Sequence, residues 1–185
     1  MKAKWLEDTV EYSGRELRPH WCFEKTGIIG DVIVGFIGGC KVEGDDLVDL
    51  ADRRDGKTVR GERMLHFICE IFGIPLIGVV FAQRLLCSIA KDSINQSIGR
   101  NLVVRKGDDL FVGDGKLSVS IATVSPVSGL IHLGLNIETR GVPVKASCLE
   151  DLGIDATSLG IDVMSRFCEE VDDCMMATKK VRPVI

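Results

Sequence analysis

The residues best suited to chemistry lie between positions 105 and 137, where one lysine occurs among small side chains. Across positions 116–124 apolar residues alternate with small or polar ones, which predicts a β-strand whose neighbouring side chains point to opposite faces. A lysine beside small side chains leaves room for a ligand against the sheet, and its charge would stabilise an anionic group there. The expected faces are Leu117, Val119 and Ile121 on the packed side and Lys116, Ser118, Ser120 and Ala122 on the open side.

A second strand is predicted at positions 129–137, and its alternation places His132, Gly134 and Asn136 on one face. If a hairpin connects the two strands, Asn136 comes near Lys116 at the start of the preceding strand. The two side chains would then converge on one ligand. The same alternation is typical of an ordinary hairpin with an exposed lysine and a capping asparagine, so both interpretations stay open.

Arg84 interrupts an apolar run at positions 76–90. A guanidinium group within a buried run needs a carboxylate or an anionic ligand, because an unpaired buried charge is strongly destabilising. Arg84 is therefore the second candidate for binding an anionic group. An internal ion pair with an aspartate is the alternative.

The segment 42–63 is polar and contains several arginines among its aspartates. A basic loop in front of a helix could close over phosphate groups, since arginines pair with phosphates through two hydrogen bonds. A solvated connection is the alternative.

The expected elements are an edge strand at 5–12, a strand buried on both faces at 28–40, a helix at 62–72, a short helix at 91–98, a strand at 101–106, a short turn or helix at 148–154 and a helix at 156–175. Asp155 is the expected N-cap of the last helix, which should lie across the sheet. On the helix predicted at 62–72, Glu62, His66 and Glu70 would share one stripe. That stripe suggests either a pair of metal ligands or a hydrogen-bonded histidine.

The fold class that follows is α+β, with a mixed, mainly antiparallel sheet and helices packed on one side. At 185 residues, 45% hydrophobic and 27% charged, the chain is expected to form one domain over positions 1–185. The net charge of −4 gives no general attraction to nucleic acid, so no DNA partner is expected. The seven cysteines have no metal-binding spacing, and no run is long enough to span a membrane, so we expect a cytoplasmic protein with reduced thiols and no metal.

The order DDL, then GKL with small residues, then a strand ending GLN and an aliphatic residue resembles the core of biotin and lipoate protein ligases, relatives of class II aminoacyl-tRNA synthetases. Nearly the whole chain also resembles an archaeal family of unknown function with the same fold, through segments such as MLHFICEIFG, AQRLL and VDLADRR. The resemblance implies an acyl-adenylate site at Asp109, Lys116, Gly134 and Asn136. The chain departs from the ligases at Gly107 and Asp108 and lacks their glycine- and arginine-rich loop, so biotin and lipoate are not the expected substrates.

The function implied is an adenylate-forming acyl ligase or acyltransferase that uses ATP and a small carboxylic acid. Lys116 would be catalytic, and Arg84, Asp109, Gly134 and Asn136 would bind the nucleotide or the acyl group. The acyl acceptor would be a protein or an RNA, and the chain would act alone or as a homodimer. The alternatives are a regulatory protein that binds nucleotide or acyl ligands without catalysis, and a structural subunit.

Overall fold

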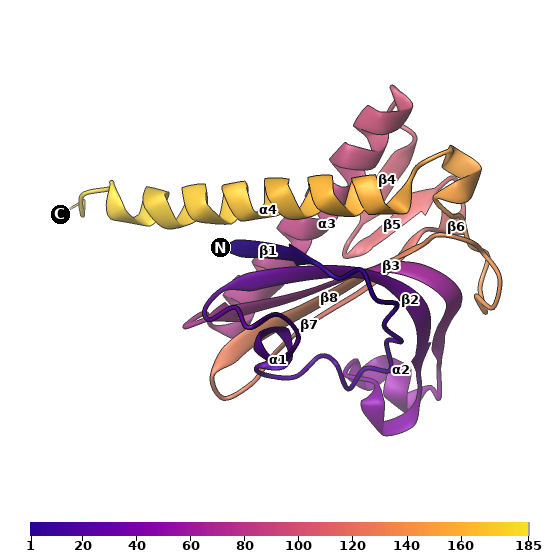
Figure 1. Cartoon of the computed structure of the whole chain (residues 1–185), viewed down its shortest axis with the longest axis horizontal. Helices are drawn as coiled ribbons and strands as arrows, with labels where there is room; N and C mark the ends of the chain where they lie inside the picture. The colour runs from indigo at the N-terminus through magenta and orange to yellow at the C-terminus, as the bar shows by residue number, and fades with distance from the viewer. Residues whose placement is uncertain (185) are drawn as a thin grey trace.

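The centre of the molecule is a five-stranded sheet in the order β1-β2-β3-β8-β7 (Figure 1). The computed structural model describes residues 1–184. β1 runs parallel to β2, and the other neighbours are antiparallel. The strands are β1 Lys2–Trp5, β2 Val32–Val42, β3 Val59–Phe72, β7 Ser118–Val124 and β8 Ser128–Asn136.

A smaller antiparallel sheet is formed by β4 Val103–Lys106, β5 Asp109–Val112 and β6 Gly115–Lys116. The strand predicted at 116–124 is therefore divided between the two sheets. At Leu117 the backbone N–H donates to the carbonyl of Leu110, and Asn136 N–H donates to the carbonyl of Leu117. Lys116 thus lies where the chain passes from the small sheet to the large one.

Two long helices, α3 Leu76–Ile98 and α4 Ala156–Lys179, cover one face of the large sheet (Figure 1). Their buried side chains form a core with the inward residues of β8, as predicted from its alternation. The carboxylate of Asp155 accepts a hydrogen bond from Ser158 N–H at 2.8 Å, which confirms the N-cap of α4. A short 3-10 helix, η2 Glu150–Leu152, precedes α4.

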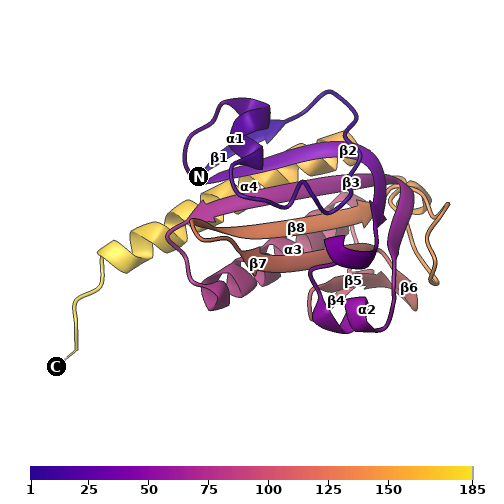
Figure 2. The same ribbon diagram turned by 90° about the horizontal axis from the view of Figure 1, so that it is seen from below.

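The opposite face is covered by shorter segments (Figure 2). These are α1 Trp21–Thr26, the 3-10 helix η1 Gly44–Asp46 and α2 Leu50–Arg54. A second core, which includes Trp21, Phe36 and Met64, lies between the sheet and the N-terminal segment. Both faces of the sheet are therefore covered.

The helix predicted at 62–72 is wrong, because this segment belongs to β3. β3 pairs with β2 on one side and β8 on the other, and nearly all of its residues from Met64 onward are buried. A central strand that is buried on both faces has no alternation, so its apolar residues also match a helical spacing. Tertiary pairing decides the structure here.

Two other boundaries differ from the prediction. The N-terminal strand is β1 at Lys2–Trp5, and farther along only Tyr12 makes a bridge, to Cys40. The apolar run at 76–90 and the helix predicted at 91–98 form the single helix α3, which ends at Gly99 with φ +68°. The strand predicted at 101–106 is confirmed as β4.

All seven cysteines are unpaired, and five of them are buried. Within residues 1–184, no helix combines the length and the apolar character needed to cross a bilayer.

Candidate functional site

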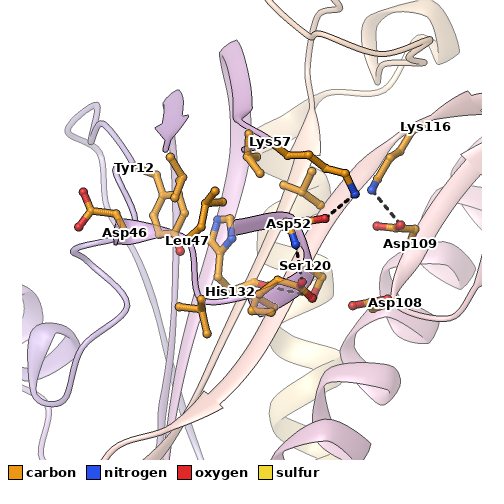
Figure 3. Close-up of a pocket in the computed structure, with 16 residues that line it drawn as sticks. Tyr12, Asp46, Leu47, Asp52, Lys57, Asp108, Asp109, Lys116, Ser120 and His132 are labelled. Carbon is orange, nitrogen blue, oxygen red and sulfur yellow. Dashed lines mark hydrogen bonds and ion pairs between the residues drawn. The ribbon is translucent and has the colours of Figure 1, made fainter. Parts of the chain in front are cut away.

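A pocket of about 360 Å³ lies on the sheet face opposite α3 and α4, beneath the segment that carries η1 and α2 (Figure 3). Its charged residues come from this segment, from the turn before β5 and the first residue of β5, and from β6. Five of them are aspartates, at positions 46, 49, 52, 108 and 109, and two are lysines, at positions 57 and 116. Its floor is formed by β7 and β8, including Val119, Ile121 and His132. The pocket is therefore acidic apart from its two lysines.

The pocket opens on the face of β7 that was predicted to be packed, which corrects the expected orientation. Ser118 is fully buried, and its Oγ accepts a hydrogen bond from Leu110 N–H at 2.8 Å. Ser120 Oγ accepts from Gln83 Nε2 on α3 and donates to the carbonyl of His132, both at 2.9 Å. The two serines of β7 thus form hydrogen bonds to β5, α3 and β8. These bonds satisfy their hydroxyl groups on the side of the sheet that faces α3.

Lys116 lies in the pocket with Asp109 as its partner (Figure 3). Lys116 Nζ is 2.8 Å from Asp109 Oδ2, and each side chain is about one-third exposed or less. Burial raises the pKa of the Asp109 carboxyl, and the hydrogen bond from Lys116 partly opposes that rise. The ammonium group is therefore held in place, with a carboxylate that an anionic ligand could replace.

Asn136 adjoins Lys116, as predicted from the hairpin, through the main chain. Asn136 Nδ2 donates to the carbonyls of Lys116 and Ser147, both at 3.1 Å. Ser147 N–H also donates to the carbonyl of Lys116, at 3.0 Å. The Asn136 side chain thus fixes the backbone that carries the lysine.

Gly134 lies on the same face of β8 as His132. A Cβ atom at this position would lie 3.0 Å from Met64 Cε and 3.2 Å from a methyl group of Val119. The absence of a side chain therefore allows these two residues to approach the strand closely.

Arg84 lies behind the pocket and forms an ion pair with Asp108, a residue that lines it. Arg84 Nη1 is 2.7 Å from Asp108 Oδ1, and Gln83 Nε2 donates to Asp108 Oδ2 at 3.2 Å. Asp108 lines the pocket, whereas Arg84 does not. The internal ion pair, which was one of the two interpretations of Arg84, is the arrangement present here.

Tyr12 and His66 were not predicted as site residues, yet both contact His132. The rings of Tyr12 and His132 stack with centroids 3.7 Å apart and an interplanar angle of 8°. His66 Nδ1 lies 3.0 Å from His132 Nε2, and His66 Nε2 lies 3.3 Å from the carbonyl oxygen of Gly38. With 62–72 recognised as a strand beside β8, the histidines could have been placed together, because His66 and His132 would then face the same way.

The carbonyl of Gly38 determines where the protons of the two histidines lie. A carbonyl only accepts, so Nε2 of His66 carries hydrogen and its Nδ1 accepts from Nε2 of His132. Burial lowers the pKa of His66 to about 4, and burial together with its neighbour lowers that of His132. Both rings are therefore neutral near pH 7. Nδ1 of His132, which has no hydrogen-bond partner among residues 1–184, carries the remaining lone pair.

The segment predicted as a basic loop presents carboxylates to the pocket. Lys57 Nζ is 2.7 Å from Asp52 Oδ1 (Figure 3), and this hydrogen bond raises the pKa of Lys57. Arg53 pairs with Asp45 and Arg54 with Asp55, whereas Arg63 pairs with Glu150 outside the segment. This segment therefore covers the pocket without lining it with guanidinium groups.

Comparison with known proteins places the chain among proteins of unknown function. A family profile described as "Domain of unknown function (DUF366)" matches residues 1–182. The chain is 37% identical over 192 residues to the uncharacterised protein MJ0805 of Methanocaldococcus jannaschii, covering all of this chain and 86% of that one. A solved protein of unknown function from Pyrococcus horikoshii has a TM-score of 0.94 at 38% identity, covering 100% of this chain and 99% of that one.

More distant structures share the fold. Biotin protein ligase from Aquifex aeolicus, in complex with biotin and ATP, has a TM-score of 0.61 at 15% identity, over 92% of this chain and 70% of that one. A putative lipoate protein ligase from T. acidophilum, Ta0514, has a TM-score of 0.61 at 12% identity, over 93% and 86%. The predicted class II synthetase-like fold is confirmed.

Proposed function

The chain belongs to the DUF366 family of unknown function, and from that premise we propose that it is an adenylate-forming acyl ligase or acyltransferase. A carboxylate oxygen of a small acid would attack the α-phosphorus of ATP, and pyrophosphate would leave. A nucleophile on a protein or RNA acceptor would then attack the acyl carbonyl, and AMP would leave. The observation that carries this proposal is the fixed ammonium group of Lys116 in a pocket on a ligase-like sheet.

Both chemical steps place negative charge on oxygen atoms, which a held cation stabilises. Lys116 pairs with Asp109 at 2.8 Å. An entering carboxylate or α-phosphate would take the place of Asp109 as its partner. Because burial already raises the pKa of Asp109, the displaced carboxyl group is suited to take up a proton.

The donor set of the pocket fits a nucleotide that brings its own cation. Five aspartates and only two lysines line the pocket, so a bare triphosphate would be repelled. A divalent ion bound to the phosphates would reverse this repulsion, and the pocket carboxylates would hold it or its water ligands. ATP would supply the activating adenylate group, and Lys57 and Lys116 would neutralise the remaining charge.

The other predicted residues would act by positioning. Asn136 holds the main chain at Lys116 through two carbonyls. Arg84 holds Asp108 in the pocket wall. Gly134 has no side chain, which leaves room for Val119 to pack against the strand at the bottom of the pocket. Each would affect the reaction through the group that it fixes.

The test begins with native mass spectrometry of freshly purified protein, to identify a retained acid. ATP–pyrophosphate exchange is then measured with Mg²⁺ and that acid, or with a panel of small carboxylic acids if none is retained. Lys116→Ala should abolish exchange. Lys145→Ala is the matched control, because Lys145 is exposed, pairs with Asp114 and does not line the pocket. Undiminished exchange in Lys116→Ala would remove the mechanism.

The second candidate is a protein that binds nucleotide or acyl ligands without catalysis. The acidic segment over the pocket favours it, since Arg53 and Arg54 of that segment pair with aspartates and do not line the pocket. A thermal-shift screen separates the two functions. Stabilisation by ATP or a non-hydrolysable acyl-adenylate, without exchange or AMP release, selects the binding protein.

A further inference from the structure

Glu70 is a buried carboxylate that lies outside the pocket of Lys116. It is 1% exposed. Its Oε1 accepts two hydrogen bonds, from His20 N–H at 2.9 Å and from Ser128 Oγ–H at 2.7 Å. In the described part of the chain, residues 1–184, no hydrogen bond or ion pair reaches Oε2. A buried carboxylate with one oxygen free is unusual, because burial of charge is unfavourable unless it is compensated.

Glu70 lines a second pocket, of about 340 Å³, between α1 and the end of β3. The other lining side chains are mostly apolar, and none is a lysine or an arginine. Phe23 is 46% exposed and Ile29 is 81% exposed, so apolar surface surrounds the opening. The lining consists of His20, Phe23, Ile28, Ile29, Gly30, Glu70 and Phe72.

The backbone at His20 shows that the carboxylate is held in this position by a specific contact. His20 has φ +63°, and it is the only non-glycine residue in the described chain with a positive φ. This conformation is unfavourable for a residue with a side chain. It precedes α1 and directs the N–H of His20 to Glu70 Oε1. The contact fixes one oxygen and leaves the other for a ligand.

We propose that this second pocket binds a small monocation, a primary ammonium group on a compact apolar body. The ammonium group would donate to Glu70 Oε2, and the body would pack against Phe23, Ile29 and Phe72. A buried carboxylate is neutralised best by a partner that brings both charge and donors, and aromatic faces also attract ammonium groups. An anionic ligand would meet an unpaired like charge.

This pocket is separate from the pocket of Lys116, with which it shares no lining residue. Figure 2 shows α1 and α2 over different parts of the same sheet face. The inference therefore stands or falls independently of adenylate formation.

The test is an NMR titration of the full chain with phenethylamine, following isoleucine and valine methyl groups. Saturable shifts are expected at Ile28 and Ile29. 2-Phenylethanol, which has the same apolar body without the charge, should bind at least tenfold more weakly. Shifts confined to Val119 and Ile121 would place the amine in the acidic pocket of Lys116 and overturn the proposal, as would equal binding of the alcohol.

Three variants complete the test. Glu70→Gln keeps an oxygen acceptor for His20 and Ser128 but removes the charge, and it should weaken phenethylamine binding at least tenfold. Ile29→Lys changes an exposed side chain, places a competing ammonium group at the opening, and should also weaken binding at least tenfold even if Glu70→Gln fails to fold. Asp52→Asn, in the other pocket, should leave binding unchanged. Unweakened binding in Ile29→Lys or in folded Glu70→Gln overturns the proposal.

Discussion

His66 Nδ1 lies 3.0 Å from His132 Nε2, so one hydrogen bond joins two histidines that are 66 residues apart in sequence. The ring of Tyr12 stacks on His132. Both rings are buried. The contact joins β3 to β8 beneath the pocket and determines which nitrogen of His132 carries hydrogen. The histidine in the floor of the candidate site, His132, is therefore held by a second, buried histidine beneath it.

The histidine pair should make stability depend on pH between about 4 and 6.5. Burial lowers the pKa of His66 in the folded state to about 4, from its ordinary value of about 6.5. The unfolded state therefore binds more protons in this window, so stability is complete above pH 6.5 and falls as the pH decreases toward 4. The loss for His66 should be about 3 kcal/mol. Urea unfolding at pH 7.0, 6.0 and 5.0 follows this loss, of which about 2 kcal/mol should be seen by pH 5.0. His20→Asn, a change at an exposed histidine, should retain the slope, and a flat profile would contradict the neutral pair.

Lys116→Ala should change the free energy of unfolding by less than about 1 kcal/mol, because its ion pair with Asp109 is partly exposed. Removal of the ammonium group should also raise the pKa of Asp109 further, since Lys116 lowers it at present. Chemical denaturation and a carboxyl NMR titration measure the two effects. A loss of several kcal/mol would show that Lys116 is mainly a structural residue.

Asn136→Ala should be more destabilising than Lys116→Ala, by about 1–3 kcal/mol. It removes the donor to the carbonyls of Lys116 and Ser147, which then lose a hydrogen bond. Urea unfolding of the two variants in parallel gives the comparison. Equal stabilities would indicate that water replaces the amide and that the main chain at Lys116 does not depend on it.

Gly38→Ala should destabilise the fold by about 3 kcal/mol or more. An added Cβ would lie 1.8 Å from the carbonyl oxygen of Val10, a backbone atom that is hard to displace. Gly78→Ala in helix α3 is the control, because its Cβ would meet side-chain atoms of Ile74 and Pro75, which precede the helix, and no distant backbone atom. Thermal unfolding compares them. Similar melting temperatures for the two variants would show that the N-terminal segment moves freely from β2.

The parts of the fold that the sequence predicts well are those whose two faces differ in residue type. β8 and α4 were recognised because their apolar residues follow a single period. β3 was not, because its polar residues Glu62, His66 and Glu70 fall four residues apart, a spacing that also matches one stripe of a helix. Local pattern reports burial, whereas strand pairing is decided by residues far apart in sequence.

The candidate site was predicted in part for the same reason. Lys116, Asp109 and Asn136 come from adjoining turns and strands of one hairpin region, so their proximity follows from local topology. Tyr12 and His66 reach His132 only through the order of the strands in the sheet. The open face of β7 was assigned to the wrong side, because its serines form hydrogen bonds with α3 and β5 and do not form an open surface for a ligand.

The carboxylates at positions 46, 49 and 52 and the lysine at position 57 come from one uninterrupted stretch between β2 and β3. Replacing this stretch alone would change the charges that cover the pocket. The hydrogen-bonded strands beneath it would stay the same. A change of ligand preference through this stretch would therefore leave the sheet as it is. Redesign of the pocket should therefore begin with the stretch between β2 and β3.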